Sequence, residues 1–144
     1  MKVKILKLDE KVNLPCYQHK HDSCMDLTNS GEAVLLEPFA RMLIHTGLKM
    51  ELPEGYELQI RPRSGLALKK GITVLNTPGT IDSNYRGEVC VILYNASDKP
   101  VMIEEGERIA QAALCNVENI EWQEVEELNS TTRNEGGFGS TGKK

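Results

Sequence analysis

The sequence predicts an all-β fold, either a sandwich, a jelly roll or a barrel. Short apolar alternations recur along most of the chain, turn residues separate them, and only one short segment has helical character. At 144 residues the chain has the length of one domain. We therefore expect one continuous core enclosed by many short strands.

The expected strands follow from period-two apolar patterns. The clearest is Tyr56, Leu58 and Ile60, which alternate with polar residues. Turn sequences with Gly, Pro or Asp at 52–55, 96–100 and 104–107 separate neighbouring strands. The patterns place strands at residues 3–5, 34–36, 42–44, 48–50, 56–60, 72–75, 89–94, 101–103, 109–114 and 122–125.

A polar hairpin is expected between two of these strands, over residues 74–88. Pro78, Gly79 and Gly87 suit a turn rather than a strand interior. Taken alone, a solvated loop is the simpler interpretation of the hairpin, because turn residues are polar for conformational reasons. Its other polar residues are Asn76, Asp82, Tyr85, Arg86 and Glu88.

The helical segment is expected at residues 64–70, directly after Arg61-Pro62-Arg63. A helix start offers unpaired N–H groups, and here a serine hydroxyl and two arginines lie beside it. These groups would suit an anion. The alternative is a helix capped by Ser64 with two surface arginines.

Composition excludes several classes of protein. A net charge of −4 gives no basic field for a nucleic-acid polymer, and no apolar run approaches the length of a membrane span or a signal peptide core. We expect a soluble, cytoplasmic protein. The four cysteines lack ligand spacing, so free thiols are expected, and the His19-x-His21 pair favours a solvated loop over a metal site.

The last sixteen residues, 129–144, are polar, rich in glycine and without an apolar period. A disordered tail is the simplest interpretation. Phe138 lies between glycines, however, which would let the backbone close over a ligand while the ring covers a flat face. Arg133 could reach a phosphate, so we expect a lid that orders on binding.

Five sequence motifs occur in a fixed order along the chain. The second, third and fifth are specific strings. The first carries Ser23 and Cys24, where the family that the motifs indicate usually has Ala-Gly. The motifs are Ser23-Cys24-Met25-Asp26-Leu27, Arg61-Pro62-Arg63-Ser64-Gly65-Leu66-Ala67, Gly79-Thr80-Ile81-Asp82-Ser83-Asn84-Tyr85-Arg86-Gly87-Glu88, Gly106-Glu107-Arg108-Ile109-Ala110-Gln111 and Arg133 through Gly142. Together they resemble the trimeric deoxyuridine triphosphate nucleotidohydrolases (dUTPases).

The resemblance implies a jelly-roll-like β-barrel of short strands with one short helix, over residues 1–128, and a flexible C-terminal arm, residues 129–144. It implies hydrolysis of dUTP to dUMP and pyrophosphate by water attack on the α-phosphorus. This reaction limits uracil incorporation into DNA and supplies dUMP for dTMP synthesis. Asp82 would be the general base.

The implied binding residues divide by the part of dUTP that they would touch. Asn76, with Thr80 and Ile81 in the hairpin edge, would read uracil, Tyr85 would lie beneath the deoxyribose, and Cys90 could wall the uracil C5 position. Arg63, Ser64, Gly65 and Gln111 would bind the α- and β-phosphates. Arg133, Ser140 and Thr141 would close on the γ-phosphate, while Phe138, followed by Gly139, would stack on uracil.

The resemblance also implies Mg²⁺ and a homotrimer. The ion would be held chiefly by the phosphates, with Asp26 touching it through water. Each site would combine motifs from several chains. Two alternatives are a dCTP deaminase of the same fold and a non-catalytic dUTPase-like nucleotide-binding regulator.

Overall fold

The computed structural model describes residues 1–138, which form ten strands and one helix. This outcome confirms the all-β prediction. The elements are β1 Lys4–Lys7, β2 Met25–Thr28, β3 Val34–Leu36, β4 Arg41–Glu51, β5 Tyr56–Arg61, α1 Ser64–Lys70, β6 Ile72–Val74, β7 Gly79–Ile81, β8 Glu88–Asn95, β9 Val101–Ile103 and β10 Arg108–Asn116.

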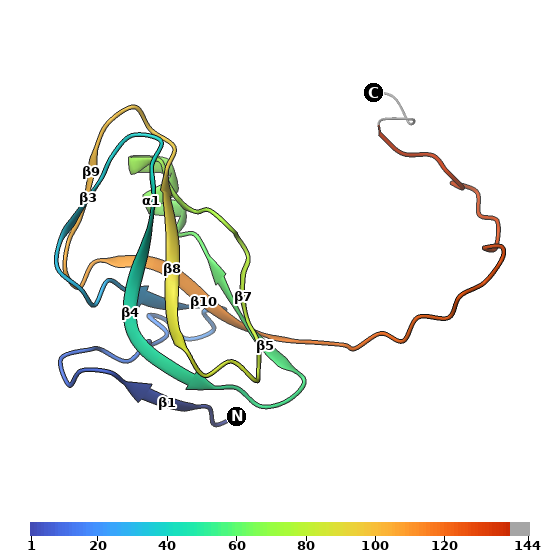
Figure 1. Ribbon diagram of the computed structural model, residues 1–144, viewed down its shortest axis with the longest axis horizontal. Helices are drawn as coiled ribbons and strands as arrows, with labels where there is room; N and C mark the ends of the chain where they lie inside the picture. The colour runs from blue at the N-terminus through green and yellow to red at the C-terminus, as the bar shows by residue number, and fades with distance from the viewer. Residues whose placement is uncertain (139–144) are drawn as a thin grey trace.

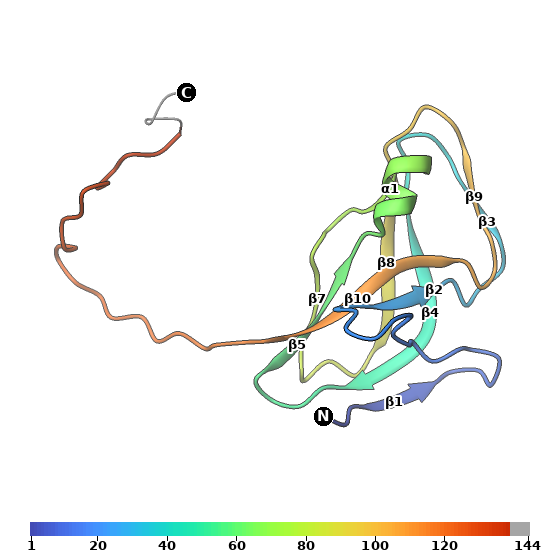
Figure 2. The ribbon, with the colours of Figure 1, turned by 180° about the vertical axis from the view of Figure 1, so that it is seen from behind.

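The strands form two four-stranded sheets and one two-stranded ribbon. The first sheet has the order β1-β4-β8-β6, the second the order β2-β10-β5-β7, and β3 pairs with β9. Every pairing is antiparallel. Figure 1 shows β4 and β8 running along the near side of the body with β10 crossing behind them, and Figure 2 shows β10 from the opposite side, in front of β4 and β8.

The core lies between the sheets. In β8 the side chains alternate, so that Val89, Val91 and Leu93 are buried while their neighbours face outward. Burial of such side chains stabilises the fold by about 1.5–3 kcal/mol each. Other fully buried members include Leu27, Leu36, Leu48, Ile72, Val74, Ile103 and Ile109.

Strand β4 joins two segments that the sequence suggested were separate strands, residues 42–44 and 48–50. A bulge links them, because the register with β8 shifts between His45 and Lys49. Gly47 within the bulge has φ of 69°, and a Cβ there would lie 2.5 Å from Val12 Cγ2. Glycine is therefore required at this position by both conformation and space.

Helix α1 has the predicted bounds but not a serine cap. Arg63 is the N-cap residue, and no side chain caps the first turn. The helix ends at Gly71 in the left-handed conformation, where the Gly71 N–H contacts the Ala67 and Leu66 carbonyls. The alternative of a helix capped by Ser64 is therefore wrong.

The polar hairpin is formed, with an added crossing. Strands β6 and β8 pair as expected, with Val74 opposite Leu93. Between them, however, β7 pairs with β5 of the other sheet, with Ile81 opposite Leu58. The polar loop therefore bridges the two sheets rather than projecting as a simple turn.

The chain beyond β10 leaves the body as an extended segment (Figure 1). The strand expected at 122–125 is not formed, and Trp122 is 87% exposed. Two strands, β2 and β7, were not anticipated. All four cysteines are free, as expected, and no helix of residues 1–138 has the length and apolar character needed to cross a membrane.

Candidate functional site

A cleft of about 440 Å³ brings together residues of three sequence motifs. We call it the cationic cleft. It lies where β2 and β10 meet the turn from β5 into α1. Its predicted members are Asp26, Arg63, Ser64, Gly65 and Gln111, and Ser23, Cys24 and Arg108 also line it.

Asp26 organises the cationic cleft. Its carboxylate lies 2.9 Å from Arg63 Nε and 3.0 Å from Arg108 Nη1. Arg63 also donates to the Arg108 carbonyl at 3.0 Å, and Gln111 donates to the Pro62 carbonyl at 2.8 Å. Two guanidinium groups on one carboxylate hold cationic hydrogen-bond donors in a fixed geometry, which suits an anion such as phosphate, and Asp22 also lines the cleft.

The start of α1 adds to this cleft. Ser64 and Gly65 are exposed, and the uncapped first turn leaves N–H groups available to a ligand. Arg61, in contrast, is turned toward Gln59, with its Nη2 2.6 Å from Gln59 Oε1. Of the two arginines that precede the helix, only Arg63 therefore lies in the cationic cleft.

A second, much smaller cavity lies beside β7. Its volume is about 40 Å³, and Asn76, Thr80, Ile81 and Cys90 line it. Gly79 closes one wall, because a Cβ there would lie 3.3 Å from the Asn76 amide nitrogen. The three predicted uracil-reading residues thus lie around one small cavity, together with Cys90.

Asp82 and Tyr85 lie just beyond β7, and Asp82 lines a third, open cleft of about 620 Å³ with Tyr56 and Arg86. The Tyr85 N–H donates to the Asp82 carbonyl at 3.1 Å, which closes a tight turn. The Tyr85 hydroxyl donates to the Glu88 carbonyl at 3.0 Å. Asp82 is exposed, so its carboxylate is accessible to a ligand.

Gly87 allows the Tyr85 ring to lie against the backbone of this turn. A Cβ at Gly87 would lie 2.1 Å from the tyrosine hydroxyl. Arg86 folds back and donates from Nη1 to the Ser83 carbonyl at 2.6 Å. The hydroxyl end of the ring is thus held beside Gly87 by its bond to the Glu88 carbonyl, and Tyr85 is 44% exposed.

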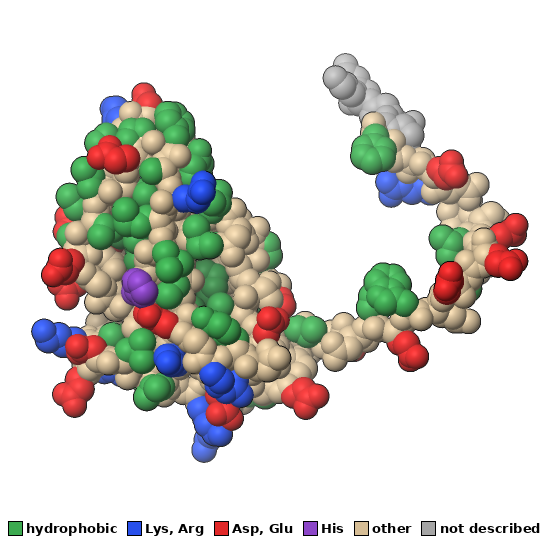
Figure 3. Space-filling view, in the orientation of Figure 1, with side chains coloured by type: hydrophobic (Ala, Val, Ile, Leu, Met, Phe, Trp, Pro, Cys, Tyr) green, Lys and Arg blue, Asp and Glu red, His purple; other side chains and the backbone are tan. Residues whose placement is uncertain are grey.

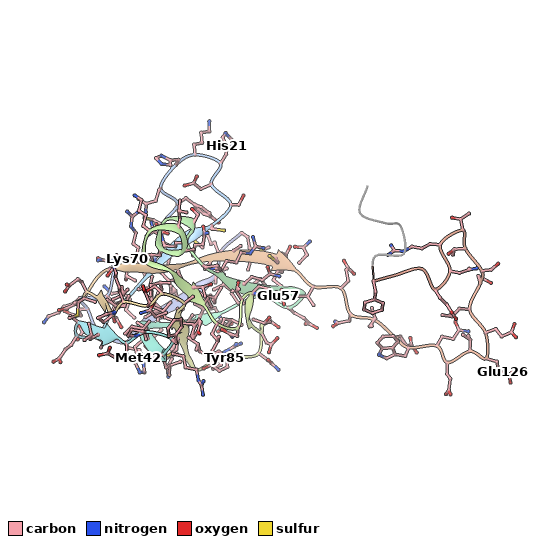
Figure 4. The ribbon with its side chains drawn as sticks, turned by 90° about the horizontal axis from the view of Figure 1, so that it is seen from above. His21, Met42, Glu57, Lys70, Tyr85 and Glu126 are labelled. Carbon is pink, nitrogen blue, oxygen red and sulfur yellow. The ribbon has the colours of Figure 1, made fainter. Side chains whose placement is uncertain are left out.

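The cationic cleft and Asp82 are well separated on one chain. Ile81 pairs with Leu58, which puts Asp82 level with Glu57, whereas Arg63 follows the opposite end of β5. Glu57 and Arg61 are about 13 Å apart along the strand, and β7 and β2 are about 14 Å apart across the sheet. Figure 4 labels a residue near each site: His21 directly precedes the cleft residues Asp22 and Ser23, and Tyr85 lies three residues after Asp82. The two labelled residues lie on opposite sides of the body.

The arm residues lie far from both clefts in the structure. Arg133 donates from Nε to the Gly136 carbonyl at 2.8 Å, and Phe138 is fully exposed. Gly139, Ser140 and Thr141 lie outside the described residues. Within residues 1–138, one chain therefore does not bring Arg133 or Phe138 to either the cationic cleft or Asp82.

Arg108 is the clearest residue that the sequence reasoning left without a role. It lies in the fourth motif, but its contact with Asp26 depends on the β2–β10 register, which a single sequence does not reveal. The His19-x-His21 segment is a loop in which the His19 N–H donates to Asp22 Oδ2 at 2.7 Å. That contact agrees with the solvated-loop interpretation.

Fold and site together define an all-β domain of the jelly-roll type, with a cleft lined by two arginines and a small cavity at different strand ends. The chain belongs to the dUTPase family, whose model matches residues 10–142.

Two bacterial relatives illustrate the similarity. The chain is 57% identical over 144 residues to the deoxyuridine 5'-triphosphate nucleotidohydrolase of Hydrogenobaculum sp., covering 100% of both chains. It is 53% identical over 144 residues to that of Fusobacterium nucleatum, covering 99% of this chain and 98% of the relative.

Solved structures that are similar to this chain are also dUTPases. A mutant dUTPase of Staphylococcus bacteriophage 80alpha, bound to dUpNHpp, matches with a TM-score of 0.88 at 28% identity, covering 98% of both chains. A mutant dUTPase of phage phi11 of S. aureus, described with a structural Mg(II) ion, matches with a TM-score of 0.82 at 26% identity. That match covers 90% of this chain and 100% of the phage chain.

Proposed function

We propose that the protein hydrolyses dUTP to dUMP and pyrophosphate. The observation that carries the proposal is the cationic cleft, in which Asp26 holds Arg63 and Arg108 beside the open start of α1. Membership of the dUTPase family supports the substrate. The relatives and solved structures reported above are all dUTPases, so neither a dCTP deaminase nor a non-catalytic regulator is favoured.

The cationic cleft would bind the α- and β-phosphates. Arg63 supplies charge, Ser64 and Gly65 supply backbone N–H groups, and the Gln111 amide lies beside them. These donors stabilise the negative charge that develops on the leaving pyrophosphate. From the arm, Arg133, Ser140 and Thr141 would close on the γ-phosphate.

The small cavity beside β7, at about 40 Å³, would receive one edge of uracil. The Asn76 amide and the backbone of Thr80 and Ile81 offer donors and acceptors to the base, and cytosine would leave these groups unpaired. A wall at C5 would come from the β8 backbone at Cys90, which lines the same cavity, because the Cys90 thiol lies 3.6 Å from His45 Nδ1 on the outer face of β8. Phe138, with Gly139 after it, would cover the base when the arm closes.

Tyr85 and Asp82 would act at the sugar and at the reacting phosphorus. The hydroxyl end of the Tyr85 ring lies against Gly87, and the ring would lie beneath the deoxyribose and leave no room for a 2′-hydroxyl. Asp82 would take a proton from water, whose oxygen bonds to the α-phosphorus while the bond to the β-phosphate oxygen breaks. Pyrophosphate leaves with that electron pair.

Mg²⁺ fits this site only as an ion carried mainly by the substrate. Both Asp26 oxygens already accept from arginines, and the one cluster of three candidate ligands among residues 1–138 does not include Asp26. A lone carboxylate reached through water suits Mg²⁺, which keeps several waters and binds phosphates. The ion would neutralise triphosphate charge.

We further propose that the protein is a homotrimer whose sites are shared between chains. A general base must lie within hydrogen-bonding reach of the attacking water, yet Asp82 and the cationic cleft of one chain are separated by about 13 Å along β5 and about 14 Å across the sheet. One substrate therefore needs Asp82 from one chain and Arg63 from another. The arm, extended away from its own body, would reach a third site (Figure 2).

An apolar outer face on β4 and β8 supports this association. Leu43 and Ile92 lie opposite each other there, and Leu43 is 52% exposed. Tyr94 and the half-exposed Leu75 extend the same face. Figure 3 shows hydrophobic side chains gathered over these strands. Monomeric proteins rarely expose such a continuous patch.

The division into a barrel over residues 1–128 and a closing arm over 129–144 is part of the proposal, with residues 117–128 as the link after β10. We place the enzyme in the cytoplasm, where its four free thiols would stay reduced. Immunolocalisation or fractionation of cells tests that placement.

Pyrophosphate release measured separately with dUTP, dCTP, dTTP and UTP, each with Mg²⁺, tests the activity. Turnover of dUTP alone is expected. Comparable turnover of another nucleotide would contradict the specificity, and ammonia release from dCTP would identify a deaminase.

Mixed oligomers test the shared site. Asp82→Asn and Arg63→Ala chains, co-expressed with different tags, should each be inactive alone. In trimers assembled at random, about a quarter of the sites would combine an intact Asp82 with an intact Arg63. Recovery approaching that fraction is expected, whereas sites built within single chains would recover nothing.

A further inference from the structure

A second cluster of chemically reactive side chains lies on the outer face of β4 and β8. It consists of His45, Glu88 and Cys90. His45 and Cys90 are register partners across the two strands, and Glu88 precedes Cys90 by two residues on the same face of β8. We call it the His-Glu-Cys cluster.

The three side chains converge on one point. His45 Nδ1 lies 2.8 Å from Glu88 Oε2 and 3.6 Å from Cys90 Sγ, and all three potential ligand atoms lie within 4.8 Å of one another. A tetrahedral zinc ion places nitrogen and sulfur ligands about 3.6 Å apart, and nitrogen and oxygen about 3.3 Å apart. Small side-chain rotations would therefore admit an ion.

The backbone fixes the carboxylate of this cluster. The Gly47 N–H, in the β4 bulge, donates to Glu88 Oε1 at 2.7 Å. This bond leaves Oε2 directed at His45. Metal sites commonly orient their ligating carboxylates by such a second hydrogen bond. The bulge exists only because Gly47 can adopt φ of 69° against Val12, so the local fold supports the arrangement.

We propose that His45, Glu88 and Cys90 form a binding site for a borderline-soft divalent metal of the zinc type, with water as the fourth ligand. A thiolate, an imidazole and a carboxylate are ligands that Zn²⁺ accepts, whereas Mg²⁺ prefers oxygen alone. The charges of thiolate and carboxylate balance that of the ion. The site is separate in chemistry from the phosphate-bound Mg²⁺ proposed above.

Loading the site requires loss of protons. Burial, and then the charge of Glu88, raise the pKa of the Cys90 thiol. The thiol is therefore protonated before the metal arrives, and formation of the metal–sulfur bond releases its proton. The bound ion would link β4 to β8 directly beside the bulge, at the edge of the apolar face proposed as a contact between chains.

Titration of the full-length protein with Co²⁺, in the presence of Mg²⁺ and a reductant, tests the proposal. One Co²⁺ per chain is expected, with tetrahedral bands in the visible and a sulfur-to-cobalt band in the near ultraviolet. Zn²⁺ added afterwards should remove both signals. Cys90→Ser should abolish the sulfur band, while Cys115→Ser, which changes a thiol near Arg61, should retain it.

His45→Gln gives a second test, because the His45 side chain is 59% exposed and its replacement leaves the core intact. A loss of Co²⁺ affinity of roughly tenfold or more is expected, since one of three protein ligands is removed. Zn²⁺ at a concentration that only just saturates the unaltered protein should raise its melting temperature more than that of His45→Gln. Absence of a sulfur band in the unaltered protein, or its persistence in Cys90→Ser, would overturn the proposal.

Discussion

The Asp26 carboxylate and the Arg63 guanidinium meet at 2.9 Å, although 37 positions of sequence separate the two residues. The contact is part-buried, with side-chain exposures of 15% and 28%. It fixes the guanidinium beside the start of α1. The position of the main cation of the cleft therefore depends on a carboxylate contributed by another strand.

Arg63→Lys should raise the KM for dUTP about tenfold to a hundredfold. Lysine keeps the charge but loses the fork that contacts both Asp26 and the Arg108 carbonyl, and a hydrogen bond to a charged group contributes about 1.5–3 kcal/mol. Steady-state pyrophosphate release measures the effect. Arg61→Lys is the matched control. An equal increase in KM in the two variants would contradict the proposed role of Arg63 in phosphate binding.

Asp82→Asn should lower kcat by about 10² to 10⁴ while leaving nucleotide binding nearly unchanged. The amide keeps the size of the side chain but cannot accept a proton from water. Single-turnover kinetics and binding of a non-hydrolysable analogue separate the two effects. Asp98→Asn, in an exposed turn, should leave kcat unaltered, and a near-normal rate for Asp82→Asn would exclude it as the base.

Tyr85→Ala should let UTP compete with dUTP, because the ring that would exclude the 2′-hydroxyl is removed. Tyr85→Phe should retain the discrimination and lose only the hydroxyl bond to the Glu88 carbonyl, at a cost of about 1 kcal/mol in unfolding free energy. The ratio of kcat/KM for the two nucleotides provides the measurement. An unchanged ratio of kcat/KM for dUTP and UTP in Tyr85→Ala would show that another residue excludes the 2′-hydroxyl.

Truncation after Leu128 should leave a folded protein with little activity. The last strand among residues 1–138 ends at Asn116, and residues 129–138 form no strand of the barrel, whereas Arg133 and Phe138 belong to the proposed closing arm. The melting temperature should therefore stay nearly unchanged, while pyrophosphate release from dUTP should fall. Removal of only the two C-terminal lysines is the control, and normal turnover by the longer truncation would refute the arm's role.

Protonation of the Glu107 carboxylate should contribute to a decrease in the free energy of unfolding at acidic pH. Burial acts to raise its pKa, but the hydrogen bonds from Lys70 and the Glu104 N–H outweigh burial and lower the pKa from its ordinary value of 4.5. The stabilisation is therefore present above pH 4.5 and is lost as pH falls below that value, through the lowered pKa of the folded state. Urea unfolding of Glu107→Gln should show a smaller decrease over this range than the parent protein.

The strand pattern was accessible from sequence wherever one face of a strand is buried. Strand β8 alternates along its whole length, and its expected bounds are nearly those observed. Strands β2 and β7 are only four and three residues long and polar in part, so local periodicity could not identify them. Conversely, Trp122 and Val125 gave an apolar pattern without a partner strand, and that segment is extended but unpaired.

For the candidate site, the sequence motifs indicated which residues to consider but not where they lie. Arg63 and Asp82 belong to neighbouring motifs, yet β5 and the β2–β10 pairing hold them at opposite ends of a sheet. The contact of Arg108 with Asp26 likewise depends on strand register. Such relationships arise from tertiary pairing, which is set by the whole fold rather than by any local segment.

The sole tryptophan of the chain, Trp122, lies beyond β10 and outside the core. Its fluorescence therefore reports the surroundings of the link to the arm rather than the packing of the barrel. Unfolding of the barrel would have to be followed by circular dichroism or tyrosine signals. A shift of tryptophan emission upon association of chains or closure of the arm would appear against a constant background from the folded body, without any introduced label.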